Sequence, residues 1–101
     1  MGSCRVLIVE DHTGIREGLA DVLEVRGYRV DVFDGGSRAL EYLESGPLPQ
    51  VALVDLLLQR DMNGWQLVEQ MKADPRLRDI PIIAMSGAAL TADHRDRKSV
   101  V

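Results

Sequence analysis

Short runs of consecutive apolar residues alternate along the chain with stretches in which apolar residues recur at helical spacing. The runs lie at 5–9, 51–55 and 81–86, and each ends in, or is followed directly by, an acidic or polar residue. Continuous apolar runs of this length are typical of parallel strands buried on both faces. A further segment, 28–33, alternates apolar and polar residues as an edge strand does. This alternation predicts an α/β fold.

Segments with helical periodicity connect the predicted strands. Apolar residues recur at helical spacing in 15–26, which ends before Gly27, in 37–45, and again in 65–72. Thr91 could begin a fourth helix as its N-cap. Strands that alternate with helices predict an open, doubly wound parallel sheet with helices on both of its faces.

The size and composition of the chain narrow its possible functions. Its 101 residues predict a single domain, 1–101. A net charge of -4 and a pI of about 5.0 argue against direct binding of nucleic acid by this domain. No apolar stretch approaches the roughly 18 residues of a membrane span, so we expect no membrane association. The lone Cys4 excludes an internal disulfide, which agrees with a cytoplasmic protein.

Polar and acidic side chains lie where the predicted buried strands end. Glu10 and Asp11 follow the first run, Asp55 ends the second, and Ser86 ends the third. In open parallel sheets, ligands bind beyond the carboxyl ends of the strands, so we expect these groups to converge. Asp55 would then lie at an edge of the sheet, exposed enough to act as a nucleophile, and not in the core.

Three carboxylates in one crevice repel each other unless a cation lies between them. An all-oxygen cluster without His or Cys suits a hard ion, and Mg²⁺ in particular. A divalent ion beside a carboxylate serves phosphoryl transfer, and the carboxylate can itself be the nucleophile that becomes an aspartyl phosphate. The Ser86 hydroxyl and the Gly87 N–H would then contact the phosphoryl oxygens.

Each candidate residue also has a structural interpretation. Glu10 and Asp11 could simply favour the start of a helix, and Asp55 could cap a turn. Ser86 with Gly87 is a common turn pair. The occurrence of these residues at the ends of three different strands favours a joint site.

The polar residues near these candidates are predicted to have structural roles. His12 is expected to face solvent at the start of the first helix. Arg16 and Glu17 are expected to form a solvated helix face. Asp61 and Asn63 are expected to make turn hydrogen bonds.

Four segments together resemble the receiver domain of bacterial two-component response regulators. They are "VLIVEDH", "VALVDLLL", "MNGWQLVEQMK" and "PIIAMSGAA", and they occur in the order of the family over nearly the whole chain. The resemblance implies a flavodoxin-like receiver fold. It also implies site residues: Glu10 and Asp11 as the acidic metal-binding pair, Asp55 as the phosphoacceptor, Ser86 as the switch hydroxyl, the Leu57 carbonyl as a further Mg²⁺ ligand, and Gly64 as the turn glycine after the acceptor loop.

The function that this resemblance implies is a phosphorylation-controlled signalling switch, not an enzyme in the usual sense. A sensor histidine kinase or a phosphotransfer protein would donate a phosphoryl group from a phosphohistidine to Asp55. The domain can assist its own phosphorylation and dephosphorylation. Haloacid-dehalogenase-like phosphatases also use an aspartate at a strand end, but they need a second Asp two residues later, where this chain has Leu57.

The C-terminal region departs from the family pattern. Receiver domains continue to a fifth strand ending in a phosphate-binding lysine and to a fifth helix, but this sequence stops at Val101. Lys98 follows Ser86 too closely for a parallel crossover of at least about 10–12 residues, so we do not expect it to be that lysine.

We therefore expect a receiver domain that is incomplete at its C-terminus and lacks the fifth strand and fifth helix. The edge of the fourth strand would be exposed, and a homo-oligomer would cover it. The alternative function is a receiver-like interaction module that acts through oligomerisation without being phosphorylated.

Overall fold

The computed structural model describes residues 4–58 and 62–85 of the chain. Its elements, in chain order, are β1 (Arg5–Val9), α1 (Thr13–Val25), β2 (Arg29–Phe33), α2 (Gly36–Ser45), β3 (Val51–Asp55), α3 (Gly64–Ala73) and β4 (Ile82–Met85). The strands and helices predicted within these residues are confirmed, with small differences at their ends. The helix expected to begin at Thr91 lies outside the described residues.

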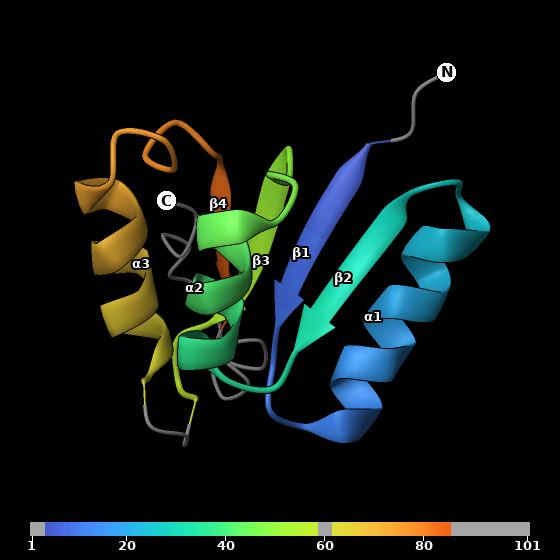
Figure 1. Cartoon of the computed structure of the whole chain (residues 1–101). Coiled ribbons are helices and arrows are strands. Elements are labelled where there is room, and N and C mark those ends of the chain that lie inside the picture. Colours follow the sequence, from blue (N-terminus) through green and yellow to red (C-terminus); the bar gives the residue numbers. More distant parts are fainter. Residues whose placement is uncertain (1–3, 59–61, 86–101) are drawn as a thin grey trace.

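Within the described residues, the strands form one parallel sheet in the order β2-β1-β3-β4, and α1, α2 and α3 pack around it (Figure 1). This confirms the predicted α/β receiver fold. The central strands β1 and β3 come from the continuous apolar runs, and Val6, Leu7, Ile8 and Val9 are all buried. β2 is an edge strand, as its alternating sequence predicts, and its Val32 is 41% exposed.

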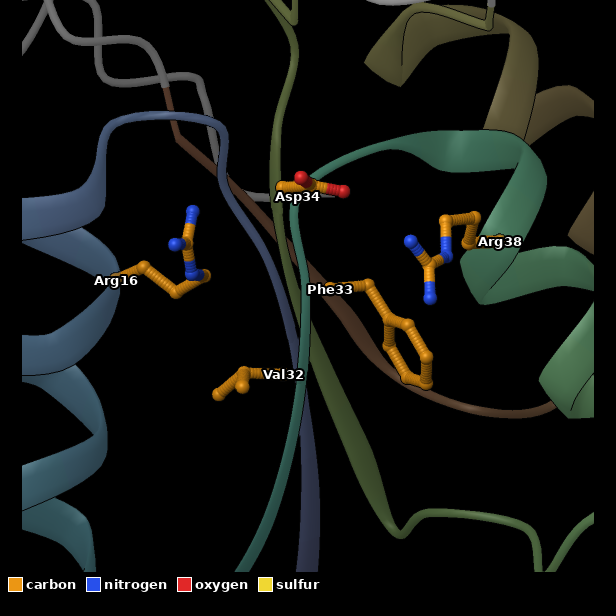
Figure 2. A pocket seen from close by; sticks show the side chains of 5 residues that line it. All are labelled: Arg16, Val32, Phe33, Asp34 and Arg38. Atoms are coloured by element: carbon orange, nitrogen blue, oxygen red, sulfur yellow. The ribbon is translucent and has the colours of Figure 1, made fainter.

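A hydrophobic core lies between one face of the sheet and the helices α2 and α3, which contact each other. Alternate strand residues such as Leu7 and Val9 meet Leu43 of α2 and Met71 of α3 in this core. α1 lies on the opposite side of β2 from α2 (Figure 2). None of the described helices has the length and apolar character needed to cross a bilayer.

Side-chain caps determine where α1 and α3 begin. His12 is the exposed N-cap of α1, as predicted, and its Nδ1 accepts a hydrogen bond from the Ile15 N–H at 3.2 Å. Asn63 and Gln66 form a reciprocal capping box at α3, with both hydrogen bonds at 2.9 Å. Asn63 therefore makes local hydrogen bonds, as expected, but as the cap of a helix and not in a turn. Asp61 lies outside the described residues.

Candidate functional site

The carboxyl ends of β1 and β3 bring three carboxylates together. Glu10 and Asp11 directly follow β1, and Asp55 is the last residue of the neighbouring strand β3. One oxygen atom from each carboxylate lies within 4.8 Å of the other two. The two adjacent parallel strands thus produce the convergence that the sequence predicts for these three residues.

Asp55 is more enclosed than its position at a strand end suggests. Only 6% of the residue is exposed, so the expectation of an exposed aspartate is wrong. The chain stays in the sheet beyond Asp55, because the Leu56 N–H donates to the carbonyl of Met85 at 2.7 Å. The chain then turns, and the Leu57 N–H donates to Asp55 Oδ1 at 3.0 Å. The carboxylate is therefore held in one orientation by the loop that follows it.

Gly64 explains how this loop can close so tightly over β3. The first residue of α3 packs directly on the backbone at the start of the acceptor loop, the segment that follows Asp55. A Cβ at Gly64 would overlap the carbonyl of Asp55 and the Cα of Leu56. Gly64 is therefore needed for close approach of two backbones. This is a physical reason for glycine at the position that the receiver resemblance assigns to a turn glycine.

Glu10 is buried, and both its main chain and its side chain are hydrogen-bonded to backbone groups. Its N–H donates to the carbonyl of Phe33 in β2 at 3.0 Å, and its Oε2 accepts from the His12 N–H at 3.0 Å. Burial raises the pKa of the Glu10 carboxyl, and the nearby charges of Asp55 and Asp11 raise it further, against the lowering effect of the His12 N–H. A cation bound at this position would relieve both the repulsion and the burial cost.

Arg16, which its sequence pattern predicts on a solvated helix face, lies instead against this site. It is half-buried, and its Nη1 donates to the carbonyl of Glu10 at 3.0 Å and to the carbonyl of Asp11 at 3.5 Å. The guanidinium thus holds the loop that carries two of the three acids. The role of Arg16 in holding this loop has a signal in the sequence: the arginine lies one turn into the helix that follows the acidic end of a strand.

The three acids fit a small divalent cation. Mg²⁺ binds oxygen ligands at about 2.0–2.1 Å, so two of its ligands lie at most about 4.2 Å apart. The three carboxylate oxygens lie within 4.8 Å of one another, slightly wider than this limit, so a shared ion would draw them closer together. The donor set contains oxygen alone, and it is the only such cluster among the residues that the structure describes.

Several predicted site residues are not tested by the structure. Ser86 and Gly87 lie outside the described residues, and so does Lys98. Leu57 lies in the acceptor loop, with its backbone N–H bonded to Asp55, while the role of its carbonyl as a metal ligand stays a prediction.

Comparison with known proteins identifies the family. Residues 6–98 match the family model of the response regulator receiver domain. The chain belongs to this family. The two-component response regulator ORR5 of rice (Oryza sativa subsp. japonica) is 34% identical over 85 residues, which cover 84% of this chain and 63% of the rice protein. The response regulator receiver protein CpdR of Brucella abortus is 33% identical over 90 residues, which cover 88% of this chain and 73% of that protein.

Solved structures of receiver domains share the fold. The signal receiver domain of a signal transduction histidine kinase from Syntrophus aciditrophicus superimposes with a TM-score of 0.79 at 31% identity, covering 96% of this chain and 70% of that one. The N-terminal domain of a response regulator receiver protein from Methanoculleus marisnigri gives a TM-score of 0.73 at 35% identity, covering 79% of this chain and 63% of that one. This receiver domain spans less than two thirds of the length of its rice relative.

Proposed function

We propose that this receiver domain is a phosphoacceptor in a two-component signal transduction system and is phosphorylated on Asp55. The observation that carries the proposal is the convergence of Glu10, Asp11 and Asp55 from two neighbouring strand ends. A sensor histidine kinase or a phosphotransfer protein in the cytoplasm would supply the phosphoryl group. The rice and Brucella relatives, named as response regulators, support this assignment.

The chemistry follows from the orientation of Asp55. The Leu57 N–H holds Oδ1, so Oδ2 would be the oxygen that attacks the phosphorus atom. The new O–P bond forms as the P–N bond to the donor's imidazole breaks, and the leaving nitrogen keeps the electron pair and takes up a proton from solvent. Mg²⁺, held by Glu10, Asp11, Asp55 and the Leu57 carbonyl, would neutralise the phosphoryl oxygens during the transfer. The Ser86 hydroxyl and the Gly87 N–H would bind the phosphoryl oxygens of the product.

The test uses a small phosphodonor, so that no partner kinase is needed. The protein is incubated with acetyl phosphate and Mg²⁺, and its intact mass is followed. We expect addition of a single phosphoryl group, which disappears in Asp55→Asn and when EDTA removes the metal. Asp21→Asn is the matched control, because Asp21 is an exposed aspartate on α1, and it should be phosphorylated normally. Equal modification of Asp55→Asn would refute the proposal.

A second candidate function is a protein interaction module that acts through homo-oligomerisation. The supporting observation is that β4 pairs with β3 alone among the described residues, and that Ile83 in β4 is 43% exposed. An unpaired apolar strand edge favours pairing with another chain. Light scattering at micromolar concentration tests this candidate. A stable monomer would contradict it, and a dimer that Ile83→Lys dissociates would support it.

A further inference from the structure

A polar pocket separate from the acidic cluster lies at the carboxyl end of the edge strand β2, between α1 and α2 (Figure 2). Its volume is about 240 Å³. The residues that line it are Arg16, Val32, Phe33, Asp34 and Arg38. None of the three clustered carboxylates contributes to this lining. The pocket is therefore a second candidate site, and its chemistry differs from that of the acidic cluster.

The pocket is rich in hydrogen-bond donors. A guanidinium carries five N–H donors. Arg16 directs Nη1 to two backbone carbonyls and Nη2 to the Thr13 hydroxyl at 3.4 Å, so some of its donors remain for a ligand. Arg38 makes no hydrogen bond or ion pair within the described part of the chain. Two guanidiniums from different helices offer the planar donor pairs that carboxylates and phosphates accept.

The arrangement of the two arginines restricts the shape of a ligand. Figure 2 shows Arg16 extending from α1 on one side of β2 and Arg38 extending from α2 on the other, with Asp34 at the end of the strand between them. One small monovalent anion would contact one guanidinium at a time. A ligand with an acidic group at each end would be able to contact both, because both arginines line the same pocket. Val32 lies on the same side of β2 as Arg16, and Phe33 lies on the same side as Arg38, so each arginine has an apolar neighbour in the pocket (Figure 2).

We propose that this pocket binds a small anion with two acidic groups, a diphosphate or a dicarboxylate, between Arg16 and Arg38. The three charged side chains of the lining sum to one net positive charge, because Asp34 offsets one arginine. Asp34 therefore limits the affinity and disfavours anions of low charge. The proposal depends on the fold and the pocket, and it holds whether or not Asp55 is phosphorylated.

The test is a titration of the ¹⁵N-labelled protein followed by NMR, after a chelating resin has removed metal ions so that the acidic cluster holds none. Pyrophosphate and succinate are the two probes, and they distinguish a diphosphate from a dicarboxylate. We expect saturable shifts of the Val32, Phe33 and Asp34 amides with at least one probe. Sodium chloride at matched ionic strength should not reproduce them.

Two variants that should change the affinity in opposite directions make the test specific. Arg38→Ala should weaken binding about tenfold, because it removes one charge-assisted contact. Asp34→Asn should tighten binding, since it removes the negative charge between the arginines. Arg29→Ala, an exposed arginine at the other end of β2, is the control and should leave the affinity unchanged. Shifts that do not saturate, or an affinity that is the same in Arg38→Ala, would overturn the proposal. Neither outcome would bear on phosphorylation of Asp55.

Discussion

Glu10 shows how the surroundings of one side chain set its chemistry. It is only 4% exposed and lies beside two other carboxylates. Its raised pKa means that the folded protein holds the Glu10 proton more tightly than the unfolded chain does. The ionised residue therefore opposes folding at neutral pH while it favours the binding of a cation. We infer that the ionised Glu10 lowers the stability of the metal-free fold and that this cost accompanies a metal site.

Replacement of Glu10 tests whether its charge lowers the stability of the metal-free protein. A raised carboxyl pKa contributes stability that is present below the unfolded pKa and is lost as pH rises through the folded pKa. Without divalent ions, Glu10→Gln should therefore be more stable than the natural protein at pH 7, by roughly 0.5–1 kcal/mol. The glutamine can still accept the His12 N–H. The difference should vanish below about pH 4.5, the ordinary value for this carboxyl.

Urea denaturation at the two pH values measures this effect. Glu17→Gln, which changes an exposed glutamate of α1, is the control and should alter the stability little at either pH. If Glu10→Gln were less stable than the natural protein at pH 7, the electrostatic interpretation of Glu10 would be wrong.

The elements around the site depend on how closely two backbones approach. The start of α3 lies against the acceptor loop, and Gly64 is the residue at the contact. The capping box of Asn63 and Gln66 spans this contact, since Gly64 lies between the two residues, and it orients the helix. A side chain at Gly64 would therefore displace α3 and the loop that bonds to Asp55 at the same time.

Two glycine substitutions test whether Gly64 is needed for close packing or only for the flexibility of the chain. Gly64→Ala should reduce the free energy of unfolding by roughly 1–3 kcal/mol, because the new Cβ has no space. Gly18→Ala, in the middle of α1, has nothing within 4 Å of the new Cβ and should increase stability by roughly 0.5–1 kcal/mol. Urea midpoints with unchanged slopes would measure both changes. Equal effects of the two substitutions would contradict the close packing of Gly64.

At the scale of the whole molecule, the acidic site exists only in the folded state. Its ligands come from two strands separated in sequence, and they meet because β1 and β3 are neighbours in the sheet. An ion that binds these residues together binds the native protein and not the unfolded chain. Metal binding and global stability are therefore linked.

This linkage predicts that Mg²⁺ raises the melting temperature of the protein. At about a hundred times its dissociation constant, the ion should add about 2.7 kcal/mol to the free energy of unfolding. Calorimetry in magnesium chloride, compared with sodium chloride at equal ionic strength, measures the effect. Asp55→Asn should show a smaller increase, because it removes one ligand charge. A melting temperature that is the same in both salts would argue against a metal site.

The sequence indicates the main features of the architecture because the spacing of apolar residues shows which faces of each strand and helix are buried. The continuous runs around Val6–Val9 and Val51–Val54 predict central strands, and the alternation of 28–33 predicts an edge strand. The acids at the strand ends predict a cluster, since parallel strands share one carboxyl edge. That Asn63 bonds the nearby backbone likewise follows from residue type, although it caps a helix and not a turn.

The contacts between distant residues were decided by the tertiary structure. Arg16 has the pattern of a solvated helix residue, yet the return of the chain over β1 places its guanidinium on the carbonyls of Glu10 and Asp11. Asp55 ends a strand, yet the acceptor loop and α3 enclose it. Periodicity specifies the faces of one element at a time. Which side chains meet, and how deeply they are buried, depends on strand order and on the packing of several elements together.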